Sequence, residues 1–453
     1  MVHFSNRSEL INIMDNKILY VVHCIDTEGP LTETLTATFE RLKTIFGISL
    51  DATEENLKKL QNQQINFEGD KAAIAKCFSP KLLKYNSNWE ELEEMLDDLM
   101  SVGFRNQNCD DFNNGWVYSW HCMDHVGYSE NPRQKDIGYG NIFNFYKSKL
   151  KNLHNNKDEL NWHFHPLSFL RKPTQAATSY INNYDVLIQI LCRRILDSNW
   201  FPVVNRPGFH SERPDSHAFL EQWIPFDFAN QFCEEIEDQP DLSNGRFGDW
   251  SRAPKTWRGY RPSHDDYQVE GTCRRIIFRC LNVGTRLRSL KREHVRDAFF
   301  EARAAGSAIL SFANHDYRDM RPDVNRVQEM LGDIKSEFPD VLIKYSGAEE
   351  AAIALMKFES KPAPKLTLNL DGQRAIIEVV EGEIFGPQPF LAIKTKEGNY
   401  YHDNLDVIQS KKKWSYVFDD QTFELDNIAK IGVGTAGLFG KRSVAQIILS
   451  EEE

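Results

Sequence analysis

Short apolar runs rich in β-branched side chains alternate with segments of helical periodicity between residues 18 and 358. The first run, ILYVVHCI at 18–25, is continuous, which is typical of a strand buried on both faces. Such alternation predicts parallel βα units, and hence an α/β fold that is either a barrel or a doubly wound sheet. Further strands are expected at 160–165, 201–205, 308–313 and 341–345, and helices at 35–46, 89–102, 181–197, 294–305 and 348–358.

The pattern changes after the proline-containing segment 360–364, which has the composition of a linker. Beyond it, short alternating runs are separated by turn residues, and no helical pattern is present. We therefore expect two domains: a barrel domain over 1–359, with an irregular insertion near 104–148, and a small all-β domain of the sandwich type over 363–453.

One glycine string in this C-terminal region matches the dinucleotide-binding fingerprint as letters alone. Gly432, Gly434 and Gly437 have the required spacing. The fingerprint needs a following helix and a second βαβ half, and too few residues remain for either. We interpret the three as turn glycines of a β-rich domain.

Composition excludes several classes of protein. Lys and Arg number 54 against 66 Asp and Glu, so the chain carries a formal charge of −12 and has no bulk attraction for nucleic acid. No apolar stretch approaches the roughly 18 residues of a membrane span. The first 16 residues do not resemble a signal peptide, and the eight scattered cysteines include no CxxC pair. These features predict a cytoplasmic protein with reduced thiols.

Polar clusters follow four of the expected strands, where parallel α/β folds place their chemistry. His163 and His165 would share one face of a strand, so both imidazoles could reach one cation, although two exposed histidines would look the same. Asp26 and Glu28 follow the first strand and could supply a metal ligand and a general base. They would equally suit the N-terminus of the next helix.

The other two strand-end clusters contain Arg206 and His315. Arg206 could keep a catalytic carboxylate ionised, or form a surface ion pair. His315, next to Asp316, could protonate a leaving group, or make a structural hydrogen bond in a loop.

Other polar and aromatic groups have less specific interpretations. Four polar residues, Asp124, His125, His210 and Glu212, could face the cleft or make ordinary loop hydrogen bonds, and we expect the latter. Two aromatic groups could stack on sugar rings or belong to the core; they are Trp116, Tyr118 and Trp120, and Trp250, Trp257 and Tyr260.

In this order along the chain, the clusters resemble the motifs of the polysaccharide deacetylase family (NodB-homology, carbohydrate esterase 4-like). The counterparts are IDTE at 25–28, WHFHP at 162–166, RPG at 206–208, PFDF at 225–228 and SFANHD at 311–316. The resemblance covers residues 18–355 by motif order. It implies a deformed (β/α) barrel, which the C-terminal all-β domain would follow.

The resemblance also implies one divalent metal ion, held by Glu28, His163 and His165. Zn²⁺ is the first expectation, and Co²⁺, Mn²⁺ or Fe²⁺ would suit the same ligands. The best-known members have HxxxH and adjacent aspartates, whereas HxH and DxE resemble variants linked to bacterial surface-polysaccharide synthesis. This spacing leaves open whether Asp26 or Glu28 binds the metal. The stretch 119–143 resembles a substrate-facing loop of that subgroup.

By the same resemblance, Asp26 would be the base on the attacking water, Arg206 would orient it, and His315 would protonate the departing amine. The expected function is hydrolysis of an N-acyl group, usually acetyl, from an amino sugar. Two other functions remain open: a non-catalytic carbohydrate-binding protein with a degenerate site, and an amidohydrolase acting on a non-sugar amide.

Overall fold

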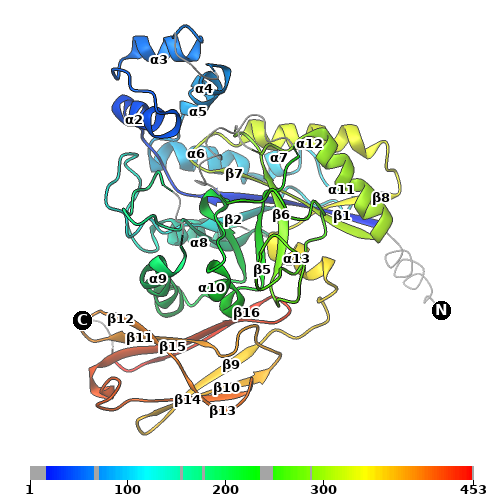
Figure 1. Ribbon diagram of the computed structural model, residues 1–453. Helices are drawn as coiled ribbons and strands as arrows, with labels where there is room; N and C mark the ends of the chain where they lie inside the picture. The colour runs from blue at the N-terminus through cyan, green and yellow to red at the C-terminus, as the bar shows by residue number, and fades with distance from the viewer. Residues whose placement is uncertain are drawn as a thin grey trace, which may run out of the picture.

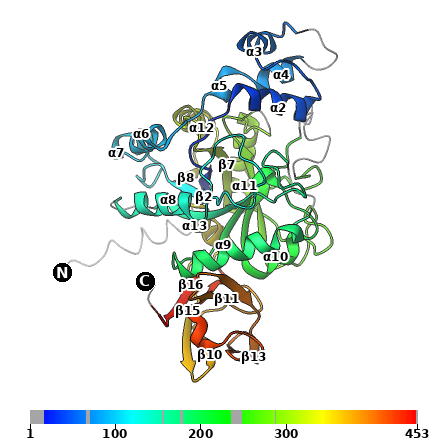
Figure 2. The same cartoon turned by 90° about the vertical axis from the view of Figure 1, so that its left-hand side faces the viewer.

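The computed structural model describes residues 17–65, 71–153, 157–175, 179–234, 248–285 and 288–450. In the view of Figure 1, a parallel α/β barrel lies in the middle, a group of short helices above it and two antiparallel sheets below it. The turned view of Figure 2 shows the same arrangement. Within these ranges, none of the helices has both the length and the apolar character that crossing a membrane requires.

Seven parallel strands form a closed barrel in which each strand pairs with the next one along the chain. They are β1 (Lys17–Thr27), β2 (Tyr118–Cys122), β3 (Glu159–Phe164), β4 (Val204–Pro207), β5 (Phe226–Asn230), β6 (Ile276–Asn282) and β7 (Ser307–His315). The barrel closes because β1 pairs with β7 on one edge and with β2 on the other. Of the two predicted α/β arrangements, the structure is therefore the barrel and not the doubly wound sheet.

Strand β1 has more neighbours than any other strand of the barrel. Its residues 23–27 pair with β2, and its residues 17–21 pair on the same edge with an eighth strand, β8 (Val341–Tyr345). It is buried from Leu19 to its end at Thr27, as its continuous apolar run predicts. Polar side chains at this buried end are tolerated only where they find partners.

Helices cover the outside of the barrel. They are α6 (Trp89–Leu99), α7 (Val102–Arg105), α8 (Asn141–Lys151), α9 (Tyr184–Leu196), α10 (Ser216–Trp223), α11 (Arg292–Ala305), α12 (Arg321–Lys335) and α13 (Ala348–Leu355). The stretch 104–148, which the sequence suggests is irregular, contains the end of α7, the strand β2 and most of α8. All five residues of β2 are buried, but YSWHC has neither polar alternation nor a continuous apolar run, so periodicity does not reveal it.

A small helical cap projects from the barrel between β1 and α6, and is drawn in blue at the top of Figure 1. It consists of α2 (Leu35–Phe46), α3 (Glu54–Gln61), α4 (Lys71–Cys77) and α5 (Pro80–Leu83). Its apolar cluster is separate from the barrel core and includes Phe39, Leu42, Leu60 and Phe78. The cap is therefore a distinct packing unit above the strand ends.

Two antiparallel four-stranded sheets follow the barrel, as the sequence predicts. One has the order β13-β14-β10-β9 and the other β12-β11-β15-β16. Their strands are β9 (Lys365–Asp371), β10 (Arg374–Glu381), β11 (Phe390–Thr395), β12 (Tyr400–Asp403), β13 (Asp406–Gln409), β14 (Lys413–Val417), β15 (Ile428–Ala436) and β16 (Arg442–Ile448). Side chains of both sheets, among them Ile377, Trp414, Ile393 and Val433, form one apolar cluster.

The glycines of the dinucleotide-like string have a packing role. A Cβ atom on Gly432 would lie 2.7 Å from Cγ2 of Ile195 in α9, and one on Gly434 would lie 2.7 Å from Cδ2 of Phe201. Beside this contact, Nε2 of Gln189 donates to the backbone oxygen of Tyr400 at 2.8 Å. The interpretation as turn glycines is wrong for Gly432 and Gly434, which lie within β15 and allow it to approach the barrel.

His23, a buried histidine of β1, is expected to contribute to unfolding at acidic pH. Nε1 of Trp116 donates to Nδ1 of His23 at 3.1 Å, and Nε2 of His23 donates to Oδ1 of Asn314 at 2.9 Å. Burial lowers the pKa of His23 to about 4. The imidazole of His23 therefore binds a proton more readily in the unfolded chain than in the folded one. The contribution of neutral His23 to the free energy of unfolding is complete above about pH 6.5 and is lost as the pH falls towards 4.

We expect the free energy of unfolding of His23→Gln to fall less steeply than that of the wild type between pH 6.5 and 4. The difference in slope should approach about 1.4 kcal/mol per pH unit, the value for one proton. Urea denaturation across this range measures it, with His264→Gln, at an exposed position, as the control. Parallel curves for His23→Gln and the wild type would contradict the assignment.

Candidate active site

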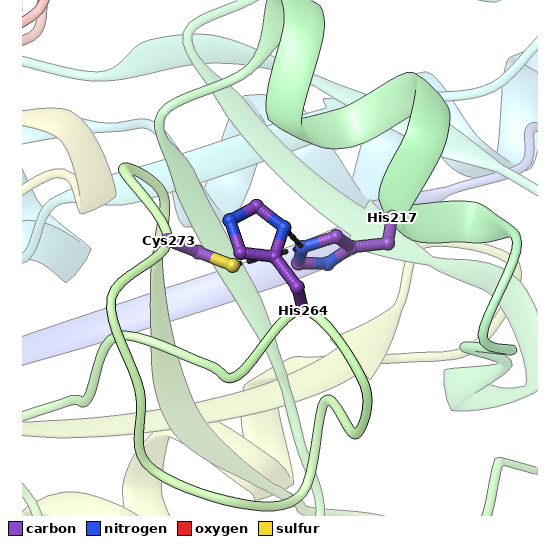
Figure 3. A group of neighbouring side chains, drawn as sticks. All are labelled: His217, His264 and Cys273. Atoms are coloured by element: carbon purple, nitrogen blue, oxygen red, sulfur yellow. Dashed lines mark hydrogen bonds between the residues drawn. The ribbon is translucent and has the colours of Figure 1, made fainter.

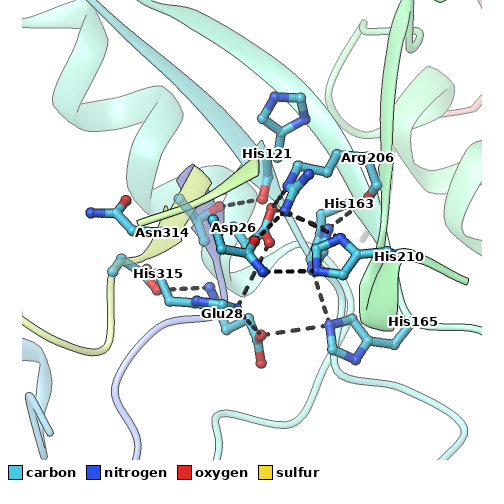
Figure 4. A network of polar contacts seen from close by, with 12 residues as sticks. Asp26, Glu28, His121, His163, His165, Arg206, His210, Asn314 and His315 are labelled. Carbon is cyan, nitrogen blue, oxygen red and sulfur yellow. Dashed lines mark hydrogen bonds and ion pairs between the residues drawn. The ribbon is translucent and has the colours of Figure 1, made fainter. Parts of the chain in front are cut away.

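The polar side chains singled out in the sequence meet at the carboxyl end of the barrel, as Figure 4 shows. They are Asp26, Glu28, His163, His165, Arg206 and His315. Asp26 pairs in register with His315 across β1 and β7, and His163 pairs with Arg206 across β3 and β4. All six except Arg206 line one cavity, and Arg206 lies behind Asp26.

Asp26 and Arg206 form a buried ion pair. Nε of Arg206 donates to Oδ1 of Asp26 at 2.7 Å, and Nη1 donates to the backbone oxygen of Phe228 at 3.0 Å. Burial opposes ionisation of Asp26, but the charge of Arg206 outweighs it and holds the pKa of this carboxyl well below its usual range. Asp26 is therefore an ionised carboxylate in a site closed to bulk water on most sides.

His163, His165 and Glu28 form a group that could hold a metal ion. Nε2 of His163 lies 2.9 Å from Nε2 of His165, and that atom lies 3.5 Å from Oε1 of Glu28. Burial lowers the pKa of both imidazoles to about 3, so they are neutral and have lone pairs to offer.

The orientation of His163 is fixed from behind. Its Nδ1 donates to the backbone oxygen of Arg206 at 2.7 Å, which leaves Nε2 unprotonated and directed at His165 and the cavity. Histidine ligands of metals are commonly held in this way by a carbonyl behind the ring. The geometry thus assigns Glu28, rather than Asp26, to the histidine pair, because Asp26 lies nearest to the protonated Nδ1 of His163, at 3.6 Å.

The turn that carries Glu28 is held by residues that sequence reasoning did not assign to the site. Asp316 accepts hydrogen bonds from the backbone nitrogens of Glu28, at 2.9 Å, and Gly29, at 3.0 Å, and from the hydroxyl of Tyr146. Nε2 of His125 donates to the backbone oxygen of Glu28 at 2.8 Å. The expected loop hydrogen bond of His125 thus exists, and it supports the site directly.

Lys135 is a further site residue without a signal in the sequence. Its ammonium group forms an ion pair with Oε2 of Glu28, and burial lowers its pKa to about 7. It comes from the segment 119–143, so this stretch does contribute to the site. A single lysine in a polar loop has no spacing or periodicity that would distinguish it beforehand.

Gly208, in the Arg-Pro-Gly motif, has a steric role beside His165. A Cβ atom at this position would lie 2.0 Å from Cδ2 of His165, so any side chain would displace the imidazole. The ring of Phe209 also contacts His165, with 4.9 Å between the ring centroids. The motif therefore fixes both Asp26, through Arg206, and the position of His165.

His315 lies opposite the two imidazoles and close to both acids. Its Nε2 is 3.8 Å from Oδ2 of Asp26 and 3.7 Å from Oε1 of Glu28. Burial lowers its pKa to about 3, against the opposing charge of Asp26, so the resting imidazole is neutral. This imidazole can therefore accept a proton from the direction of Asp26 and donate it to a group bound in the cavity.

The cavity has a volume of about 220 Å³ and extends from the five site residues that line it towards the helical cap. Aromatic side chains on its wall are those of Tyr128, Phe209 and Tyr317. The tryptophans singled out in the sequence lie elsewhere: Trp116, Trp120, Trp250 and Trp257 are buried in apolar clusters. Of their two interpretations, the structure supports core packing.

The remaining polar candidates have structural partners. Glu212 and Asp227, the acid of the PFDF motif, both bind the buried guanidinium of Arg275 at 2.8–2.9 Å. Asp124 binds Arg194 at 2.6 Å. His210 lines the cavity, and its Nδ1 lies 3.4 Å from Nη2 of Arg206.

A second group, His217, His264 and Cys273, also has the composition of a metal site (Figure 3). Nε2 of His217 lies 2.8 Å from Sγ of Cys273 and 3.2 Å from Nδ1 of His264. Its Nδ1 lies 3.2 Å from Nη2 of Arg275, which can only donate. Nδ1 therefore accepts and Nε2 keeps the ring proton. This is the opposite tautomer to that of His163. Nε2 of His217, which faces His264 and Cys273, therefore has no lone pair to offer to a metal ion.

Compared with models of protein families, with curated proteins and with solved structures, the chain gives no match.

The contrast between the two histidine groups predicts the metal content. Protein stripped with a chelator and reloaded with Zn²⁺ should bind one equivalent per chain, because Nε2 of His163 carries a lone pair whereas Nε2 of His217 carries a proton. His163→Ala should lose this equivalent, and Cys273→Ser should retain it. Elemental analysis after gel filtration measures both. Two equivalents in the wild type, or metal loss in Cys273→Ser, would contradict the tautomer assignment.

Proposed function

We propose that the protein is a metal-dependent hydrolase that removes an N-acyl group, expected to be acetyl, from an amino sugar. One observation carries the proposal: a ligand group, an ionised carboxylate and a facing imidazole surround one cavity at the carboxyl end of a closed parallel barrel. The barrel and the motif order are consistent with the polysaccharide deacetylase type of fold. The subgroup linked to surface-polysaccharide synthesis remains the preferred assignment.

Glu28, His163 and His165 would hold the metal ion. Two neutral imidazoles and one carboxylate suit Zn²⁺, and also Co²⁺, Mn²⁺ or Fe²⁺. Such an ion supplies Lewis acidity, which activates water and stabilises negative charge on an amide oxygen. Lys135, which is paired with Glu28, would face the same region and add positive charge there.

Asp26 is the base in this mechanism. It accepts a proton from the water that attacks the acyl carbon, and Arg206 keeps it ionised until then. The proton passes from Oδ2 of Asp26 towards Nε2 of His315, which is 3.8 Å away. His315 then delivers it to the amide nitrogen as the carbon–nitrogen bond breaks. The products are a carboxylate and a free amine.

Activity assays test this assignment. The Zn²⁺-loaded wild type should release acetate from one or more members of a panel of N-acetyl sugar nucleotides. Asp26→Asn and His315→Gln should each lower kcat by about 100- to 10,000-fold, the usual contribution of a general acid or base. Cys273→Ser, outside the cavity, is the matched control and should retain the wild-type rate.

The two other functions have distinct outcomes in the same assay. Cleavage of small cyclic amides, with no cleavage of N-acetyl sugars, would make the protein an amidohydrolase of a different substrate class. Absence of all hydrolysis, combined with sugar binding that persists in Glu28→Ala, would favour a non-catalytic carbohydrate-binding protein. Either result contradicts the proposed function.

The ion pair of Asp26 predicts a pH effect. Because Arg206 holds the pKa of Asp26 below its usual range, Arg206→Met should raise it. The acidic limb of kcat/KM should then move to higher pH, since the base is protonated earlier, whereas Arg206→Lys should move it less. An acidic limb at the wild-type position in Arg206→Met would contradict the role of Asp26 as base.

A further inference from the structure

Three arginines line the outer part of the cavity, beyond the candidate catalytic residues. Arg41 comes from helix α2 of the cap, Arg133 from the segment between β2 and α8, and Arg318 from the residues after β7. The chain as a whole carries a formal charge of −12, so a cluster of cations on this one wall runs against its average charge. We refer to these three residues as the arginine cluster.

Two members of the arginine cluster share a single carboxylate. Glu33 accepts hydrogen bonds from Nε and Nη2 of Arg41, at 2.9 and 3.1 Å, and from the hydroxyl of Tyr85 at 2.9 Å. Nε of Arg133 lies 3.4 Å from the same carboxylate, which Arg41 already binds. One negative charge thus serves two guanidinium groups.

Arg318 has no carboxylate partner in the part of the chain that the structure describes. Its Nε donates to the backbone oxygen of Leu82 in the cap at 3.1 Å. Its guanidinium lies over the rings of Tyr85 and Tyr317, with 5.3 and 4.9 Å to the ring centroids. The aromatic rings and the carbonyl hold the group in place without neutralising it.

The other charged residues on the cavity wall are balanced among themselves. Lys135 is paired with Glu28, and Asp26 with Arg206. Glu130 lies 3.8 Å from Lys172. By ion pairs within the described residues, the arginine cluster therefore has one carboxylate, Glu33, for three guanidinium groups. Unpaired charge in a partly closed site is costly unless a counter-ion is present.

We propose that the substrate carries a phosphate or a carboxylate group, and that the arginine cluster binds this group. The inference rests on the proposed function, whose substrate class it narrows from amino sugars to anionic amino sugars. Guanidinium groups match the planar, bidentate geometry of carboxylate and phosphate oxygens. The three planar cations of the cluster converge on one wall.

The cluster and the candidate catalytic residues are linked by Tyr317. Its ring lies 4.7 Å from the imidazole of His315 and 4.9 Å from the guanidinium of Arg318. A sugar bound in the cavity between His315 and Arg318 would direct its N-acyl group towards Asp26 and His315 and its anionic group towards the cap. The anionic group of the substrate would thus determine the orientation in which the sugar enters the cavity.

Equilibrium binding to metal-free protein tests the inference, because a phosphate cannot then bind through a metal. The probes are N-acetylglucosamine 1-phosphate, N-acetylglucosaminuronate and neutral N-acetylglucosamine. Calorimetry should show at least tenfold tighter binding of an anionic probe than of the neutral one. A preference for the phosphate alone identifies phosphate as the bound group, and a preference for both anions includes carboxylate.

Variants of the arginine cluster test whether these residues cause the preference for anionic probes. Arg318→Gln and Arg133→Gln should each reduce the binding of the anionic probe about tenfold and leave the neutral probe unaffected. Arg318→Lys should restore part of the loss in Arg318→Gln, which excludes misfolding as its cause. Arg252→Gln is the matched control, since Arg252 forms an exposed ion pair with Asp266 away from the cavity.

Equal binding of all three probes, no binding of either anion, or a preference that survives both glutamine variants would overturn the inference. Its failure is distinct from that of the proposed function because binding is measured without turnover. Hydrolysis of neutral and anionic N-acetyl sugars at equal rates would refute the inference alone. Anion binding by the arginine cluster without any amide hydrolysis would refute the proposed function alone.

Discussion

Closure of the barrel through β1 is the constraint on which the site depends. This strand is hydrogen-bonded on both edges, and its register with β7 sets Asp26 beside His315. The neighbouring β3–β4 register sets His163 beside Arg206. Residues far apart in the sequence therefore meet because parallel strands end at one rim, and no flexible segment is needed to bring these four together.

Burial creates the chemistry of the site, and paired charges make that burial tolerable. Removal from water keeps the imidazoles neutral, whereas Arg206 keeps Asp26 ionised in the same environment. Both effects lower the pKa of the group concerned, so the cavity holds an ionised carboxylate beside neutral imidazoles. His217 differs, because Nη2 of Arg275 donates to its Nδ1 and the ring proton stays on Nε2. Ligand composition alone therefore does not define a metal site.

Sequence reasoning identifies the residues whose signal is local. The strand-end clusters, the α/β pattern and the change to β structure after residue 360 all follow from spacing and periodicity. It misses three strands of the barrel, β2, β5 and β6; β2, for example, mixes polar and aromatic residues and so lacks a period. It also misses Lys135 and the support from Asp316, since their roles arise from contacts across the barrel. Gly432 and Gly434 are interpreted from the sequence as turn glycines, whereas in the structure they allow β15 to pack closely against α9.

Locating a bound metal by anomalous X-ray scattering from crystals of Zn²⁺-loaded protein tests the central claim most directly. The account predicts one strong peak within coordination distance of Nε2 of His163, Nε2 of His165 and a carboxylate oxygen of Glu28, with Asp26 outside that distance. A peak between His217, His264 and Cys273, with none at the barrel rim, would contradict it.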